Sequence, residues 1–169
     1  MKRFKLIVFF LFLANITSAQ NQITCSVYTG AGSGTNLGGI FGVGCEIKYK
    51  FVSVNVATGY PFHVSNKIGF VSRFDYDTGV KIYAPFGAFA GINYGYLTSP
   101  SYNNESKSIT RFHGLSYSIG YRHTIFKKIY GLAYVGIAPN KRKEDKNAWF
   151  VNTKNDYLPK FGLLLGYEF

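Results

Sequence analysis

The side chains best suited to chemistry stand between residues 63 and 77. His63 and Ser65 are separated by one residue, and two carboxylates, Asp75 and Asp77, follow them. A histidine that is oriented by an acid can act as a base and activate a serine hydroxyl for attack on an ester. His63, Ser65 and Asp77 are therefore candidate residues for such chemistry.

Two cysteines form a second candidate pair. A hairpin centred on residue 35 would place Cys25 and Cys45 opposite each other on the same face of two neighbouring strands. In an oxidising compartment they can then form a disulfide, provided that their Cα atoms approach to about 4.4–6.8 Å. The alternative is that both are small apolar residues on the outer face. The sequence has no CxxC motif and no cluster of His and Cys, so it gives no support for a bound metal.

Residues 30–34, Gly-Ala-Gly-Ser-Gly, invite comparison with a phosphate-binding loop. The third glycine of a dinucleotide motif and the Lys-Ser of a P-loop are both missing, and no helix pattern follows that could point its N-terminus at a phosphate. We therefore expect a surface loop over residues 31–38 and no cofactor.

A basic segment lies near the end of the chain. Lys141, Arg142, Lys143 and Lys146 stand within a few residues of one another. Such a segment can bind anionic lipopolysaccharide headgroups or another surface polyanion. The alternative is a solvated loop without a partner.

The composition indicates that strands position these residues. The chain has 169 residues, a formal charge of +11, 18% aromatic residues and 19 glycines. Helix formers are few, and glycine scattered among Tyr, Val, Ile, Phe and Thr is typical of an all-β chain. A helical bundle and a βαβ enzyme are disfavoured, and the length predicts one domain.

The first residues have the pattern of a secretory signal peptide. Lys2, Arg3 and Lys5 precede an apolar run over residues 6–14, and Thr17-Ser18-Ala19 offers a cleavage site before Gln20. The run is too short to span a bilayer as a helix, which needs about 20 residues. We expect residues 1–19 to be removed and residues 20–169 to form the folded domain.

Apolar and small or polar residues alternate through the rest of the chain, as in strands with one apolar face. The predicted strands cover residues 22–30, 40–50, 52–60, 67–77, 81–96, 114–122, 129–138 and 160–169, and the phase of the seventh is ambiguous. The predicted connections are short turns at 50–51, 77–80 and 124–128, and longer loops at 31–38, 61–66, 98–111 and 139–157. Strands of about 9–11 residues match the thickness of a bilayer.

Glycine dominates the face opposite the apolar one, at positions such as Gly44, Gly120, Gly162 and Gly166. Small residues suit the crowded interior of an eight-stranded barrel, which side chains fill. Charged residues share this face and would need to pair there. They are Glu46, Lys48, Arg73, Asp75, Lys81, Arg122 and Glu168. The prediction is an all-β, eight-stranded, antiparallel, up-and-down transmembrane β-barrel.

The last strand ends the chain with alternating Phe161, Leu163, Leu165, Tyr167 and Phe169. With the signal peptide and the alternating strands, this ending resembles the small outer-membrane barrels of the OmpA/OmpX type, including porin-like relatives. The resemblance implies an outer-membrane location in a Gram-negative envelope, insertion by the barrel-assembly machinery, and contact with lipid and lipopolysaccharide. An outer-membrane address also argues against nucleic acid as a partner.

The run His63-Val64-Ser65-Asn66 resembles the His-x-Ser-Asn signature of lipid A 3-O-deacylases, which are also eight-stranded barrels. The resemblance implies that His63 is the base, Ser65 the nucleophile and Asp77 the orienting acid. Two departures count against this reading. The motif falls after the third predicted strand instead of near the C-terminus. The predicted topology also places Asp77 at the periplasmic rim, about 30 Å from an extracellular His63.

Three functions therefore stay open. The leading one is a structural or surface-interaction role for a barrel with a plugged lumen and exposed loops. The alternatives are a narrow porin-like channel and a lipid A deacylase that uses His63 and Ser65.

Overall fold

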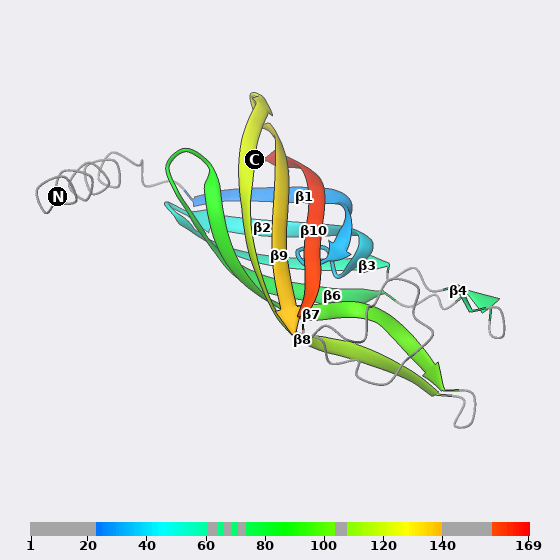
Figure 1. Ribbon diagram of the computed structural model, residues 1–169. Coiled ribbons are helices and arrows are strands. Elements are labelled where there is room, and N and C mark those ends of the chain that lie inside the picture. Colours follow the sequence, from blue (N-terminus) through cyan, green and yellow to red (C-terminus); the bar gives the residue numbers. More distant parts are fainter. Residues whose placement is uncertain (1–22, 61–63, 66–68, 71–73, 104–107, 140–156) are drawn as a thin grey trace, which may run out of the picture.

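The computed structural model describes residues 23–60, 64–65, 69–70, 74–103, 108–139 and 157–169 (Figure 1). All regular structure in these residues is β-strand. Within them, no helix has the length and apolar character needed to cross a bilayer. The predicted signal peptide at 1–19 and the basic residues at 141–146 lie outside the described residues.

Eight strands close into a barrel in which every neighbouring pair is antiparallel. They are β1 (Ile23–Gly34), β2 (Gly39–Tyr49), β3 (Val52–Tyr60), β6 (Asp75–Tyr83), β7 (Ala88–Asn103), β8 (Ser108–Phe126), β9 (Ile129–Pro139) and β10 (Tyr157–Glu168). Strands that follow each other in the chain lie side by side, and β10 closes on β1. The two short strands β4 (Val64–Ser65) and β5 (Gly69–Phe70) pair with each other outside the barrel. The predicted all-β fold, an eight-stranded antiparallel up-and-down barrel, is confirmed.

The two rims of the barrel differ in their connections. Residues 50–51, 84–87 and 127–128 connect strands at one rim, which also holds the start of β1 and the end of β10. Lys50 and Lys127 adopt positive φ in their two-residue turns, at 54° and 41°. Residues 35–38, 61–74, 104–107 and 140–156 connect strands at the opposite rim. We call these the short-turn rim and the loop rim.

The predicted alternation of inward and outward side chains is confirmed in nearly all of the described strands. Phe41, Val43 and Leu163 point outward, and Leu163 is 70% exposed. On β9, whose phase the sequence left ambiguous, Tyr130, Leu132 and Tyr134 are buried inside the barrel. Tyr96 departs from the alternation, because it is buried together with its neighbour Leu97. The pairing of β7 with β8 becomes irregular just after this residue, with a register shift between Tyr96 and Thr98.

Glycines inside the barrel make room for aromatic rings on neighbouring strands. The pairs are Tyr28 with Gly44, Phe89 with Gly120, Tyr134 with Gly162, and Tyr130 with Gly166. A Cβ added to Gly44 would lie 2.5 Å from the Tyr28 ring, and one added to Gly166 would lie 2.2 Å from the Tyr130 ring. The inner glycines therefore act as sockets for rings, which confirms the crowded interior predicted from the sequence.

The turn predicted at 77–80 is wrong, because residues 75–83 form β6 and the turn lies at 84–87. Asp77 and Gly79 look like turn residues, but the Asp77 side chain is buried in the interior and Gly79 makes space for Asn93. Pro85 occupies the real turn, where a proline removes no ladder hydrogen bond. The turn ends on Gly87, which has a φ of 97°.

Two predicted loops also differ. Residues 98–111 were expected to form a long loop, but β7 and β8 continue through most of this span as a hairpin that projects past the barrel (Figure 1). Residues 31–38 were expected to be a surface loop, but β1 continues to Gly34 and residues 35–38 are buried.

Candidate functional site in the barrel interior

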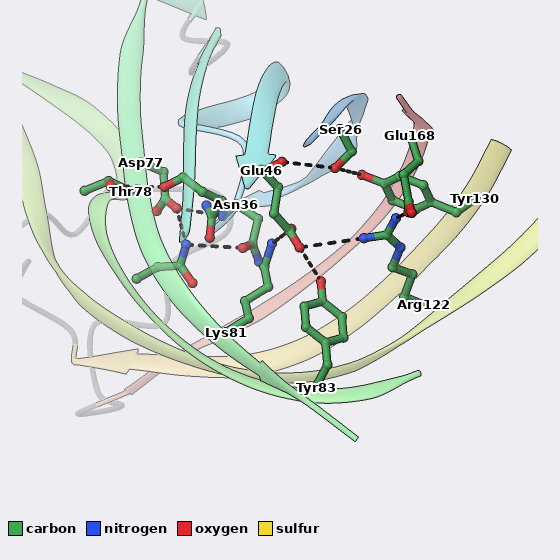
Figure 2. Close-up of polar contacts among 12 residues, drawn as sticks. Ser26, Asn36, Glu46, Asp77, Thr78, Lys81, Tyr83, Arg122, Tyr130 and Glu168 are labelled. Atoms are coloured by element: carbon green, nitrogen blue, oxygen red, sulfur yellow. Dashed lines mark hydrogen bonds and ion pairs between the residues drawn. The ribbon is translucent and has the colours of Figure 1, made fainter. Parts of the chain in front are cut away.

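The interior contains a network of paired charges centred on Glu46 of β2 (Figure 2). The Lys81 ammonium lies 2.6 Å from Glu46 Oε2, and the Tyr83 hydroxyl donates to Oε1 at 2.9 Å. Nη1 of Arg122 lies 3.7 Å from Oε1. Glu46 is 1% exposed and Lys81 is fully buried, so these charges depend on each other for stabilisation.

Arg122 extends the network to the strands that close the barrel. Its guanidinium pairs with Glu168 of β10 and stacks on the Tyr130 ring of β9, with 3.6 Å from Cζ to the ring centroid. The Tyr130 hydroxyl donates to Ser26 Oγ on β1 at 3.2 Å. Glu46, Lys81, Arg122 and Glu168 thus pair with one another as their predicted lumen positions require.

A second polar cluster fills the interior nearer the loop rim. Asp77 Oδ1 accepts the Asn36 backbone N–H at 2.9 Å and the Asn93 side-chain amide at 2.5 Å. The same Asn93 amide lies 3.2 Å from Asn36 Oδ1. Asn36, Asp77 and Asn93 are each 1% exposed or less. The cluster fastens the connection between β1 and β2 to β6 and β7.

That connection, residues 35–38, enters the barrel as a plug. Thr35 donates through Oγ1 to Ser116 Oγ at 3.1 Å, and its carbonyl accepts the Tyr134 hydroxyl. The Leu37 side chain is fully buried. The segment itself did not predict this arrangement, because a glycine-rich segment between strands is usually a surface turn. The run of inward polar residues on β6, β7 and β8 was the available signal.

His113 and Asp75 form a contact that the sequence did not predict. His113 Nε2 lies 2.5 Å from Asp75 Oδ1, and its ring stacks on Tyr76 with centroids 5.0 Å apart. The two residues come from β8 and β6, with β7 between them. Only the strand register brings them together, which explains why sequence spacing could not reveal the pair.

Of the three predicted catalytic residues, Asp77 is the one whose side chain lies in the described part of the chain. Asp77 was expected at the periplasmic rim, and this is wrong because it lies inside the barrel near the loop rim. Its Oδ1 already binds Asn36 and Asn93. His63 and the side chain of Ser65 lie outside the described residues, as does Arg73.

Cys25 and Cys45 are not opposite each other. Cys25 pairs with Ile47, and Cys45 pairs with Val27, so the cysteines occupy diagonal positions. Both are free and exposed on the outer face. Diagonal residues have Cα atoms about 7–8 Å apart, which exceeds the usual disulfide range. The expected register was wrong by two residues because the hairpin is centred on residue 36.

The described residues hold no group of three His, Cys, Asp or Glu side chains suited to a metal ion. What they define is a closed eight-stranded antiparallel barrel with an apolar exterior and a charge-paired polar interior. No protein-family model matches the sequence, and no curated protein is similar to it.

Proposed function

We propose that this protein is an outer-membrane β-barrel with a structural and surface-interaction role. The observation that supports this most strongly is the polarity of the barrel wall. Large apolar side chains on all eight strands point outward and are exposed, among them Phe41, Ile119 and Leu163. Charged and amide side chains point inward. A water-soluble barrel has the reverse arrangement, whereas hydrocarbon around the barrel favours this one.

The filled interior favours a structural role over transport. The Glu46 network crosses the barrel toward the short-turn rim, and the plug of residues 35–38 fills it toward the loop rim. Breaking buried ion pairs is strongly unfavourable. A porin-like channel would require both barriers to part, so steady conductance is not expected.

The surface role belongs to the loop rim. The β7–β8 hairpin projects past the barrel there, and the segment with Lys141, Arg142, Lys143 and Lys146 connects β9 to β10 at the same rim. Short turns face the periplasm in outer-membrane barrels, so the loop rim would face outward. Basic side chains there would contact lipopolysaccharide or another polyanion.

Expression in a Gram-negative host tests the proposal. We expect the processed chain, without residues 1–19, in the outer-membrane fraction. It should migrate differently on a gel before and after boiling, because a membrane barrel stays folded in cold detergent. A chain that is soluble without detergent as a compact monomer would contradict the proposal.

Two assays address the alternatives. In planar bilayers we expect no discrete openings from the wild type, and steady openings that change in an Arg122→Ala variant would establish the channel instead. Lipid A mass spectrometry of cells with wild type or Ser65→Ala should show identical acylation. Acyl loss that depends on Ser65 would establish the deacylase.

A further inference from the structure

The turn between β8 and β9 carries two lysines at the short-turn rim. Lys127 and Lys128 are the two residues of this turn, and both are exposed. The Lys127 ammonium lies 5.6 Å from the centroid of the Phe126 ring, and the Lys128 ammonium lies 5.9 Å from that of the Tyr167 ring. Both rings are exposed on the outer face of the barrel. The two ammonium groups therefore lie over the outer face of the rim.

An irregularity in β8 shapes the surface next to these lysines. The register between β8 and β9 shifts between Thr124 and Phe126. Ile125 and Phe126, which follow each other in the chain, are both exposed, at 61% and 62%. The Lys128 carbonyl accepts the backbone N–H of Glu168 at 2.8 Å, which fastens the turn to the end of β10 (Figure 1). The two lysines thus stand on a fixed turn beside apolar side chains.

A shallow furrow runs along the outer face of β9 from this turn toward the middle of the wall. Gly131 and Ala133 form its floor, and larger outward side chains flank it. Ala133 pairs with Leu163 of β10 on one side and with Tyr121 of β8 on the other, and all three border the same hollow. Neighbouring strands lie about 4.8 Å apart, so β8 and β10 are separated by about 10 Å. This width accommodates one alkyl chain between their side chains.

The charge of the two lysines is not neutralised by an ion pair. None of the ion pairs in the described part of the chain involves Lys127 or Lys128. Glu168, on the neighbouring strand, pairs with Arg122 of the interior network. Two adjacent cations at the end of an apolar furrow are complementary to a molecule that has an anionic head and an apolar chain.

We propose that the β8–β9 turn binds the phosphate of an anionic glycerophospholipid in the leaflet at the short-turn rim. Lys127 and Lys128 pair with the phosphate, and one acyl chain lies in the furrow over Gly131 and Ala133. Tyr167 is suited to the boundary between headgroup and chain, because its ring is apolar and its hydroxyl is polar. The proposal rests on the proposed membrane location, since only a bilayer around the barrel supplies this lipid to the outer face.

The opposite side of the same rim offers a comparison. Two strands separate the β2–β3 turn from the β8–β9 turn in either direction around the barrel. The Lys50 ammonium there lies 5.4 Å from the centroid of the outward Tyr49 ring. Lys48 points inward instead, with its ammonium 4.9 Å from the centroid of the buried Tyr83 ring. This pair of lysines thus places one ammonium over the outer face, where the β8–β9 turn places two.

The test uses the full mature chain in phosphatidylcholine vesicles that contain a trace of spin-labelled lipid. The labelled lipid is either phosphatidylglycerol, which is anionic, or phosphatidylcholine, which has no net charge. Electron paramagnetic resonance measures the fraction of labelled lipid that the barrel holds in a motionally restricted state. We expect the wild type to prefer phosphatidylglycerol by about fivefold at low salt, and the Lys127→Gln/Lys128→Gln variant to lose this preference. Lys48→Gln/Lys50→Gln removes the same charge from the same rim and should keep the preference.

Further variants separate the charge from the furrow. Lys127→Arg/Lys128→Arg should keep the preference, whereas Ala133→Phe, which fills the furrow, should lower it. Val56→Phe, on the exposed outer face of β3, is the control for Ala133→Phe and should have no effect.

Three results would overturn the proposal: no preference in the wild type, equal preference in the two double glutamine variants, or a preference that Ala133→Phe leaves unchanged. Any of them in a barrel that inserts into vesicles would leave the proposed function intact. Failure of the wild type to insert would contradict the proposed function itself.

Discussion

At the level of single residues, the main feature of the barrel interior is its buried, paired charges. Glu46 contacts three partners at once, namely Lys81 and Tyr83 of β6 and Arg122 of β8. The carboxylate therefore ties together strands that are not neighbours. Removing one member leaves the remaining charges buried without compensation.

We predict that Lys81→Met destabilises the barrel by about 3–5 kcal/mol, because it strands the buried Glu46 carboxylate. Urea unfolding in detergent, followed by tryptophan fluorescence and gel mobility, measures the change. The double variant Glu46→Gln/Lys81→Met should be more stable than the two single effects added together. Lys50→Met, at a half-buried turn position outside the Glu46 ion pairs, is the control. Equal stability of Lys81→Met and the control would show that the ion pair contributes nothing.

The glycine sockets give a second prediction at this scale. Gly44→Ala places a Cβ about 2.5 Å from the Tyr28 ring, so we expect a loss of about 1–3 kcal/mol from overpacking. Gly131→Ala is the matched control, since its Cβ would meet only the end of the Ile125 side chain at 3.3 Å. Replacing Tyr28 by Ala in the Gly44→Ala background should remove the clash. An identical effect of both glycine substitutions would contradict the socket model.

At the scale of elements, the connection between β1 and β2 matters most. Asp77 holds this plug through the Asn36 backbone and the Asn93 amide. We predict that Asp77→Ala raises hydrogen exchange at Asn36 and Leu37 by about tenfold or more, with little change at β9 and β10. Mass-spectrometric exchange on the folded barrel provides the measurement.

Asp75→Ala is the comparison variant, because it removes a different carboxylate from the same strand. It breaks the contact with His113 and leaves the Asn36 hydrogen bond in place. Faster exchange of the plug in Asp75→Ala but not in Asp77→Ala would show that the plug is held in another way.

The sequence predicted side-chain direction well because alternation is a local property. The inward and outward residues of β2, β3 and β10 follow directly from it. Strand ends were harder to predict, because Asp77, Thr78 and Gly79 have turn propensity that interior packing overrides. The plug, the His113–Asp75 contact and the pairing of β1 with β10 depend on register across several strands. Spacing within one segment cannot supply that register.

At the scale of the whole molecule, the proposed function requires hydrocarbon around the outer face of the barrel. Leu163 lies at the middle of the outer face, paired with Ala31 on one side and Ala133 on the other. We predict that Leu163→Arg destabilises the barrel in lipid vesicles by about 2–4 kcal/mol. Leu164→Gln, which places a polar group in the polar interior, should have a smaller effect. The opposite order of these two effects would mean that the outer face does not contact hydrocarbon.

The most direct measurement uses the native Cys45, which is exposed on the outer face of β2. A nitroxide is attached to it in a Cys25→Ser variant inserted into vesicles, and its collisions with oxygen and with a water-soluble nickel complex are compared. We predict high accessibility to oxygen and low accessibility to nickel. A label on Ser53→Cys, inside the barrel, in a variant that lacks both native cysteines, should be shielded from both. Ready access of nickel to Cys45 would contradict the account.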